Sequence, residues 1–243
     1  MTRSANPLLD ALRQAASGDE AARDDAIRRY GFAVPDGDAL AAIAERAPAG
    51  VVEIGAGTGY WAAQLAGYGV DVVAYDPEPA PSPANRWFAG AEPWFEVAAA
   101  DHRVVERHPD RLLLLVWPTR NETWAADAVT AHARAGGRAL AYVGEGPGGR
   151  TGDDRFHALL GEIDQCLHCT YGVADTACTC GVTPLWRRSH LIDLPRWPGC
   201  DDRLHIYARS TNGTPTPGEA EDTPRPHRRG LFGRFRRDRS GRA

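Results

Sequence analysis

Short apolar runs alternate with amphipathic stretches along the middle of the chain. The amphipathic segments 59–67 and 122–135 have helical spacing, and 84–92 is a further helix candidate within Pro-rich surroundings. Strands of a parallel sheet that is covered on both faces read as nearly continuous apolar runs. The pattern therefore predicts an α/β fold with a doubly wound, mostly parallel sheet. Its strands are expected at 51–54, 71–75, 97–100, 111–117 and 138–143.

The two ends of the chain differ from this middle part. A helix predicted at 153–166 is followed by strand candidates at 187–194 and 203–209, which suit an antiparallel pair that completes a seven-stranded sheet. N-cap residues and apolar spacing predict three helices before the sheet, and none of them carries an obvious site. We therefore divide the chain into a helical cap (1–48), a sheet domain (49–210) with a Cys-rich insertion (166–181), and a disordered tail (211–243).

A glycine-rich turn follows the first predicted strand. Residues 51–60 read Val-Val-Glu-Ile-Gly-Ala-Gly-Thr-Gly-Tyr, so a strand leads into the turn and a helix leaves it. Glycines allow a tight turn and a close approach of the backbone to a ligand. A dinucleotide fingerprint would require glycine where this chain has Tyr60. The carboxylate of Glu53 would repel a pyrophosphate and attract a cationic amino group.

This segment resembles the first motif of the class I S-adenosylmethionine-dependent methyltransferases, E/D-x-G-x-G-x-G. The resemblance extends over roughly 35–209 and implies a Rossmann-like methyltransferase fold. In that family the turn contacts the methionine part of the cofactor. The alternative is a tight glycine turn without a ligand. The resemblance implies cofactor contacts at Glu53, Gly55, Gly57, Gly59 and Tyr60.

Acidic residues also end the next two predicted strands. Asp76 can accept hydrogen bonds from both ribose hydroxyls of an adenosine, and in the resembled family an acidic residue at this position does so. The family commonly places another acidic side chain against the adenine amino group, which suggests Asp101, with His102 beside the adenine. A turn-forming Asp76 and a surface His102 are the alternatives. Ligands of open α/β sheets bind along this edge, so the acidic strand ends support one another.

Candidates for catalysis are fewer. Trp117 and Pro118 stand where some N-methyltransferases of the family carry Asp/Asn-Pro-Pro-aromatic, but the polar first residue is missing, which weakens the case for a nucleic-acid amine as acceptor. Trp117 is expected either to wall the methyl-transfer pocket or to fill the sheet edge. Glu145, at the end of the fifth strand, is the best-placed general base; alternatively, it is a loop carboxylate or a helix-capping partner.

The chain is also similar to an uncharacterised group of methyltransferase-like proteins. The similarity involves 30–35, the glycine motif, 117–118, 143–145 and 149–156. No substrate is established for that group. The similarity therefore strengthens the expected fold and cofactor and leaves the reaction open.

Five cysteines lie in the last third of the chain. Cys166, Cys169, Cys178 and Cys180 are expected to bind a structural zinc ion, because four thiolates suit a closed tetrahedral site. The C-x-C spacing of the second pair is tighter than the common C-x₂-C. His168, His190 or Cys200 could replace one ligand. The alternative is a set of free or partly buried thiols.

The charges bound the chemistry and the partners. All 28 basic residues are Arg, which excludes Schiff-base enzymes, lysine bases and the P-loop lysine. The net charge of −4 divides into +4 for 211–243, with 8 Arg and 4 acidic residues, and −8 for 1–210. An acidic body argues against nucleic acid along its surface and favours a small or cationic acceptor. The basic, Phe-containing segment 227–237 could contact nucleic acid or an anionic membrane surface, or simply be solvated.

The sequence also predicts where the protein is located and what it does. No apolar run reaches the length of a signal peptide or of a membrane span, which predicts a cytoplasmic protein. We expect an S-adenosylmethionine-dependent methyltransferase acting on a small molecule. The alternative is a non-catalytic protein that binds S-adenosylmethionine or is a zinc-stapled interaction module, because no evident base accompanies the glycine motif.

Overall fold

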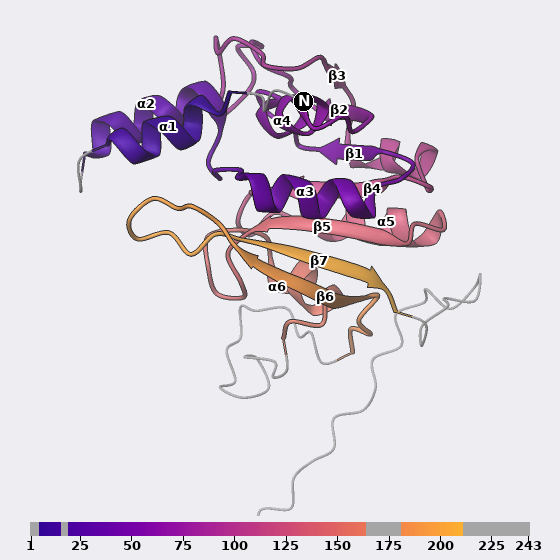
Figure 1. Ribbon diagram of the computed structural model, residues 1–243. Helices are drawn as coiled ribbons and strands as arrows, with labels where there is room; N and C mark the ends of the chain where they lie inside the picture. The colour runs from indigo at the N-terminus through magenta and orange to yellow at the C-terminus, as the bar shows by residue number, and fades with distance from the viewer. Residues whose placement is uncertain (1–4, 16–18, 164–180, 211–243) are drawn as a thin grey trace, which may run out of the picture.

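The computed structural model describes residues 5–15, 19–163 and 181–210. Three helices precede a succession of strands and helices, and the last two strands follow each other directly (Figure 1). The helices are α1 (Pro7–Gln14), α2 (Glu20–Tyr30), α3 (Gly37–Arg46), α4 (Tyr60–Gly67), α5 (Trp124–Arg134) and α6 (Asp154–Leu159), with a 3₁₀ helix η1 (His102–Arg107). The strands are β1 (Val51–Ile54), β2 (Val72–Asp76), β3 (Val97–Ala99), β4 (Leu112–Val116), β5 (Ala139–Gly144), β6 (Trp186–Asp193) and β7 (Arg203–Arg209).

The strands form one seven-stranded sheet in the order β3-β2-β1-β4-β5-β7-β6. Neighbours from β3 to β5 are parallel, whereas β7 runs antiparallel to both β5 and β6. The predicted doubly wound, mostly parallel sheet with an antiparallel last pair is therefore confirmed. The chain order reverses between β1 and β4, so the carboxyl ends of these two strands mark a topological switch point.

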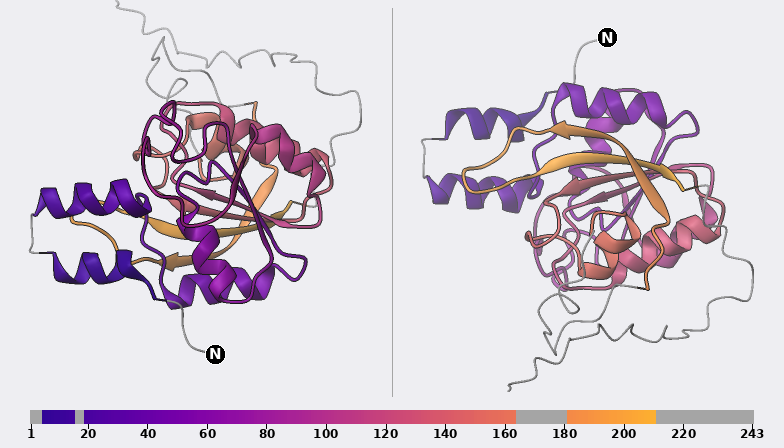
Figure 2. Two further views of the ribbon diagram at one scale, coloured as in Figure 1. Left: turned by 90° about the horizontal axis from the view of Figure 1, so that it is seen from above. Right: turned by 90° about the horizontal axis from the view of Figure 1, so that it is seen from below.

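Helices cover both faces of the sheet (Figure 2). Side chains of α3 and α4 pack on one face, and those of η1, α5 and α6 pack on the other. The packing of β4 explains its continuous apolar run. Leu112 and Leu114 belong to the apolar core on the α3 and α4 face, and Leu113 and Leu115 belong to the core on the α5 and α6 face. A strand whose two faces are both dry has no polar positions to alternate with apolar ones.

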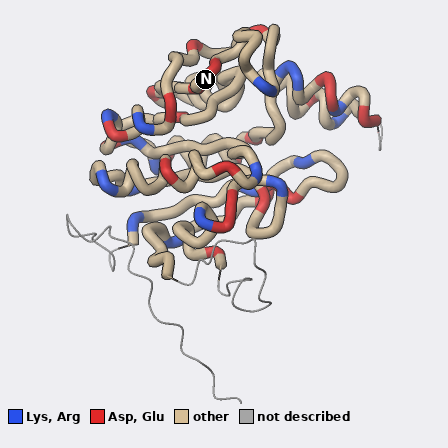
Figure 3. The backbone as a smooth tube through the Cα atoms, turned by 180° about the vertical axis from the view of Figure 1, so that it is seen from behind, with Lys and Arg blue, Asp and Glu red and all other residues tan. Residues whose placement is uncertain are grey.

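The helices α1 and α2 lie side by side and extend beyond one end of the sheet (Figures 1 and 2). Acidic and basic positions alternate along them (Figure 3). A small apolar cluster joins them to the rest of the protein, and in it Leu8 packs with Tyr60 at the start of α4. The N–H of Leu8 donates to the Tyr60 hydroxyl at 3.2 Å, and that hydroxyl donates to Asn6 Oδ1 at 2.8 Å. These two helices therefore contact α4, the helix that follows the glycine turn.

Two predicted helices differ from the structure. Residues 84–92 form successive turns, because Asn85 Oδ1 accepts the N–H groups of Trp87 at 2.9 Å and Phe88 at 2.7 Å and so competes with a helical ladder. The helix predicted at 153–166 is shorter: α6 ends at Leu159, and Gly161 follows with a φ of 68°.

A buried carboxylate joins α6 to the antiparallel strands. Glu162, whose side chain is 4% exposed, lies 3.0 Å from His157 Nδ1 and 2.9 Å from His205 Nδ1. It also accepts a hydrogen bond from the Tyr207 hydroxyl at 2.5 Å and forms an ion pair with Arg188 at 2.9 Å. Burial opposes the charge, but these hydrogen bonds and the His205 charge together hold the pKa of Glu162 far below its usual range.

Replacing this carboxylate should destabilise the fold. For Glu162→Gln we expect a loss of about 3–5 kcal/mol in the free energy of unfolding at pH 7, because the donors around it stay buried with a weaker acceptor. The folded pKa lies below the unfolded one, so the contribution is complete above about pH 4.5 and is lost as the pH falls below it. Urea unfolding at pH 7 and pH 3 measures both effects. The exposed Glu106→Gln is the control, and equal losses in the two variants would contradict the assignment.

Candidate functional site at the carboxyl edge of the sheet

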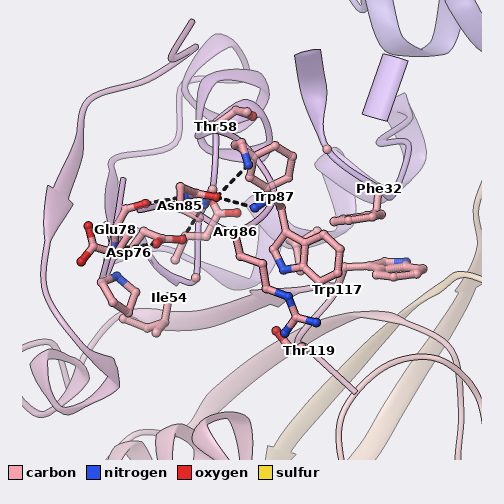
Figure 4. Close-up of a pocket in the computed structure, with 18 of the residues that line it drawn as sticks. Phe32, Ile54, Thr58, Asp76, Glu78, Asn85, Arg86, Trp87, Trp117 and Thr119 are labelled. Atoms are coloured by element: carbon pink, nitrogen blue, oxygen red, sulfur yellow. Dashed lines mark hydrogen bonds between the residues drawn. The ribbon is translucent and has the colours of Figure 1, made fainter. Parts of the chain in front are cut away.

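A cavity of about 510 Å³ lies at the carboxyl ends of the parallel strands (Figure 4). The strand ends, the glycine turn, the segment 84–88 and residues 30–32 between α2 and α3 all contribute to its walls. Gly59 and Glu145 do not line it. The other predicted cofactor and acceptor residues do: Glu53, Gly55, Gly57, Tyr60, Asp76, Asp101, His102 and Trp117.

The glycine turn has the backbone that its sequence requires. Gly55, Gly57 and Gly59 have φ values of 72°, 57° and 72°, in the left-handed region. A Cβ atom on Gly57 would lie 2.6 Å from the Phe88 ring, and one on Gly55 would lie 2.8 Å from Trp124. These close approaches leave no room for a larger residue.

Glu53 is a buried acid beside this turn. Its side chain belongs to the central strand β1, the residue is 2% exposed, and Oε2 has no hydrogen-bond partner among the described residues. Burial raises the pKa of Glu53 to about 8; a backbone hydrogen bond from Ala62 opposes this rise, and the charge of Asp76 adds to it. Near pH 7 the group is therefore mostly a neutral acid with one oxygen free for a ligand.

Asp76 and Asp101 end neighbouring strands but have different surroundings. Asp76 Oδ2 accepts the N–H of Gly57 at 3.0 Å, and its Oδ1 accepts the N–H of Glu78 at 2.9 Å. Burial raises the pKa of Asp76 despite these hydrogen bonds. Asp101 caps η1 and is ion-paired with Arg103, whose hydrogen bonds lower the pKa of Asp101 to about 2. Only Asp76 is thus tied directly to the glycine turn.

Trp117 follows β4 in an unusual conformation. Its φ of 52° lies in the left-handed region, which costs a bulky residue about 1–3 kcal/mol. Its indole N–H donates to Asp202 at 2.7 Å, and its ring stacks on Phe32 with centroids 4.4 Å apart. Burial raises the pKa of Asp202 to about 6, although the Trp117 hydrogen bond opposes this. Strain that persists at a cavity wall indicates a functional constraint on this side chain.

Glu145 does not line the cavity. It is 7% exposed, and its Oε1 is ion-paired with Arg150 Nη2 at 2.5 Å. Its Oε2 accepts the N–H of Arg150 at 2.8 Å. These hydrogen bonds lower the pKa of Glu145 although burial opposes them. The geometry favours the loop-carboxylate interpretation: Glu145 holds Arg150, which does line the cavity.

The aromatic walls were not found from the sequence. Phe32, Trp87 and Phe88 line the cavity from two segments far apart in the chain, and Figure 4 shows Phe32, Trp87 and Trp117 grouped on one side of it. Trp87 lies edge-on to Phe32, with centroids 5.5 Å apart and an interplanar angle of 87°. For Trp87 and Phe88 the available signal was the density of aromatic residues within a Pro-rich connection, and for Phe32 it was the similarity noted at 30–35.

The structure bears only in part on the expected zinc site and on the expected absence of a membrane span. Cys166, Cys169, Cys178 and Cys180 lie outside the described residues, so the zinc site stays a prediction. Residues 5–15, 19–163 and 181–210 contain no group of three or more His, Cys, Asp or Glu that could hold a metal ion. Within those residues, no helix has the length and apolar character needed to cross a membrane.

Comparisons with known proteins concern the fold. No protein-family model matches the chain, and no curated protein matches it. It is similar to the structure of magnesium protoporphyrin IX methyltransferase from Synechocystis PCC 6803 with bound SAM, at 10% identity and a TM-score of 0.44, over 84% of this chain and 90% of that one. It is also similar to the N-methyltransferase NodS from Bradyrhizobium japonicum WM9, at 13% identity, 70% and 92% coverage and a TM-score of 0.40.

A further similar structure is the antibiotic-resistance methyltransferase Kmr, at 18% identity, with 75% of this chain and 98% of that one covered and a TM-score of 0.33. The fold assignment depends on this chain's own sheet, with its order β3-β2-β1-β4-β5-β7-β6 and a single antiparallel strand between β5 and β6. That arrangement is the Rossmann-like methyltransferase fold predicted from the glycine motif.

Two glycine substitutions separate backbone strain from crowding. Gly57 and Gly69 both have a positive φ, but a Cβ on Gly69 meets nothing within 4 Å. We expect each change to Ala to cost about 1–2 kcal/mol in the left-handed conformation, and Gly57→Ala to cost a further 1–3 kcal/mol, approximately, through overpacking against Phe88. Urea unfolding of the two variants measures the difference. Equal costs would mean that Phe88 moves freely away from the turn.

Proposed function

We propose that the protein binds S-adenosylmethionine and transfers its methyl group to a small-molecule acceptor. The observation that carries this proposal is the buried acid of Glu53, with one oxygen unpartnered among the described residues, beside the glycine turn. A buried carboxyl group without a partner is costly, and it is retained where a ligand supplies the partner. A primary ammonium is the group that best matches a carboxylate in such a place.

The donor set fits the proposed cofactor. Glu53 would bind its amino group, and the left-handed glycines would let the backbone approach its methionine part. Asp76, already fixed by the N–H groups of Gly57 and Glu78, would accept the ribose hydroxyls with its remaining lone pairs. Asp101 and His102 line the same cavity and remain the proposed adenine contacts.

The chain's own part in catalysis is positioning. When bound, the cofactor would supply a methyl group on a sulfonium sulfur for transfer to an electron pair of the acceptor, with the carbon–sulfur electron pair left on sulfur as a thioether. The rigid wall at Trp117 would hold the acceptor in line with that bond, which is a large source of rate in a direct displacement. Since Glu145 is engaged by Arg150, we assign no general base, and a proton on the acceptor would leave to water.

Removing the Glu53 charge tests cofactor binding. We expect Glu53→Gln to weaken S-adenosylmethionine binding by about 10- to 150-fold, the effect of losing a hydrogen bond to a charged group. The stability of the ligand-free protein at pH 7 should change little, because glutamine resembles the neutral acid present there. Calorimetric titration measures the affinity, and Glu106→Gln is the control outside the cavity. Unchanged affinity in Glu53→Gln would refute the assignment of the amino group.

Proton release provides an independent readout. A raised folded pKa of about 8 makes Glu53 take up a proton on folding, so stability falls as the pH rises from about 4.5 to about 8. A cationic ligand favours the ionised form, so binding should release up to one proton, and affinity should rise up to about tenfold per pH unit between pH 6 and 7.5. Binding heats in phosphate and Tris buffers measure the release. It should be absent in Glu53→Gln.

Methyl transfer is tested separately from binding. Protein incubated with S-adenosylmethionine carrying a labelled methyl group and a small-molecule extract should label a low-mass product. Trp117→Ala, at the proposed acceptor wall, should reduce labelling more than it reduces cofactor affinity. Tight cofactor binding without transfer to any fraction would favour the non-catalytic binding protein.

A further inference from the structure

The cavity has two chemically different halves on either side of the switch point. Glu53, Asp76 and Asp101 come from the ends of β1, β2 and β3, and they make that half acidic. The other half follows β4 and β5 and contains two guanidinium groups, those of Arg120 and Arg150. The proposed cofactor uses the acidic half, so the basic half is available to a second molecule.

The two arginines belong to paired loops. Thr119 and Thr151 form an isolated antiparallel bridge, and the N–H of Gly152 donates to the Pro118 carbonyl at 3.0 Å. The bridge does not continue into a longer ladder, because the chain turns at Arg120 and the N–H of Asn121 donates to the Gly152 carbonyl at 3.0 Å. Arg120 and Arg150, one from each loop, both line the cavity.

Carboxylates compensate only part of this positive charge. Arg150 is ion-paired with Glu145 at 2.5 Å, and the third arginine of the cavity, Arg86, is 3.3 Å from Glu122. The guanidinium of Arg120 has no ion pair or hydrogen bond within the part of the chain that the structure describes. One positive charge at the cavity wall is therefore left for a ligand.

An exposed indole lies in the same part of the cavity. Trp87 is 47% exposed, and it alone of the exposed large apolar side chains of the described residues lines this cavity. Arg86 lies over its ring at 4.6 Å, and Phe32 meets it edge-on. Trp117, in contrast, is already stacked on Phe32 and lies 5.7 Å from the Arg150 guanidinium. Of these two indoles, Trp87 is therefore the one that is accessible to a ligand (Figure 4).

We propose that this half of the cavity binds a planar aromatic carboxylate, with its ring against Trp87 and its carboxylate on Arg120. A guanidinium binds a carboxylate through parallel hydrogen bonds, and an aromatic face binds a flat ring, so the two features together select this chemical class. That the bound molecule is the methyl acceptor rests on the proposed function. The binding site itself does not.

Three probes of matched shape or charge test the site on the full chain. They are 2-naphthoate, its neutral counterpart 2-naphthamide, and cyclohexanecarboxylate, each titrated by calorimetry with and without saturating S-adenosylhomocysteine. We expect 2-naphthoate to bind at least tenfold more tightly than either of the others. Arg120→Gln should weaken 2-naphthoate about tenfold and leave 2-naphthamide unchanged. Trp87→Leu should weaken both naphthyl compounds and leave cyclohexanecarboxylate unchanged.

The controls separate this inference from the proposed function. Arg120 and Trp87 are exposed, so their variants should fold, and a thermal melt checks this. Arg13→Gln removes another exposed guanidinium, on α1 and outside the cavity, and should change no affinity. Absence of 2-naphthoate binding, equal binding of 2-naphthamide, or an unchanged affinity in Arg120→Gln overturns the proposal. If S-adenosylhomocysteine binds and 2-naphthoate does not, only this inference fails. If 2-naphthoate binds and S-adenosylhomocysteine does not, the aromatic carboxylate site is supported and the cofactor assignment of the proposed function fails.

Discussion

The carboxyl group of Glu53 is buried in the middle of the sheet, and the rest of the site is arranged around it. β1 lies between β2 and β4, and all four of its residues are buried because helices cover both faces of the sheet. An isolated charge in such a place would be destabilising, and the pKa of about 8 means that the group remains neutral until a partner arrives. The glycine turn follows that acid directly, and Glu53, Gly55 and Gly57 all line the cavity.

The opposite wall depends on contacts between distant parts of the chain. Trp117 keeps its left-handed backbone because Phe32, from the segment before α3, stacks on its ring, while Asp202, from the connection before β7, accepts its indole N–H. Three regions that are separated by more than 80 residues thus fix one side chain. A wall held in this way can orient a flat acceptor at little further entropic cost.

Local patterns in the sequence predicted the sheet and the acidic strand ends, because each depends on neighbours along the chain. Glu53 and Asp76 could be found from the glycine motif and from its resemblance to the class I methyltransferases, which involves residues close together in the sequence. Phe32 and Trp87 could not, since they meet the cavity only after the helical cap and the connection before β3 fold over the sheet edge. The general-base role expected for Glu145 did not take Arg150 into account. Arg150 lies five residues later in the chain, and its ion pair with Glu145 depends on how the loop between them turns.

The net charge of the chain and the local charge of the cavity favour different ligands. The value of −8 over 1–210 favoured a small or cationic acceptor, but exposed carboxylates more than about 8–10 Å from the cavity are screened by salt. Many of those charges lie on surfaces such as α2, where acidic and basic residues pair with each other. The cavity wall itself carries Arg120 and Arg150, and Trp87 lines the same cavity. Charge that follows the strand ends on each side of the switch point, rather than the total, is therefore what supports the two proposed sites, one for a cationic cofactor and one for an anionic acceptor.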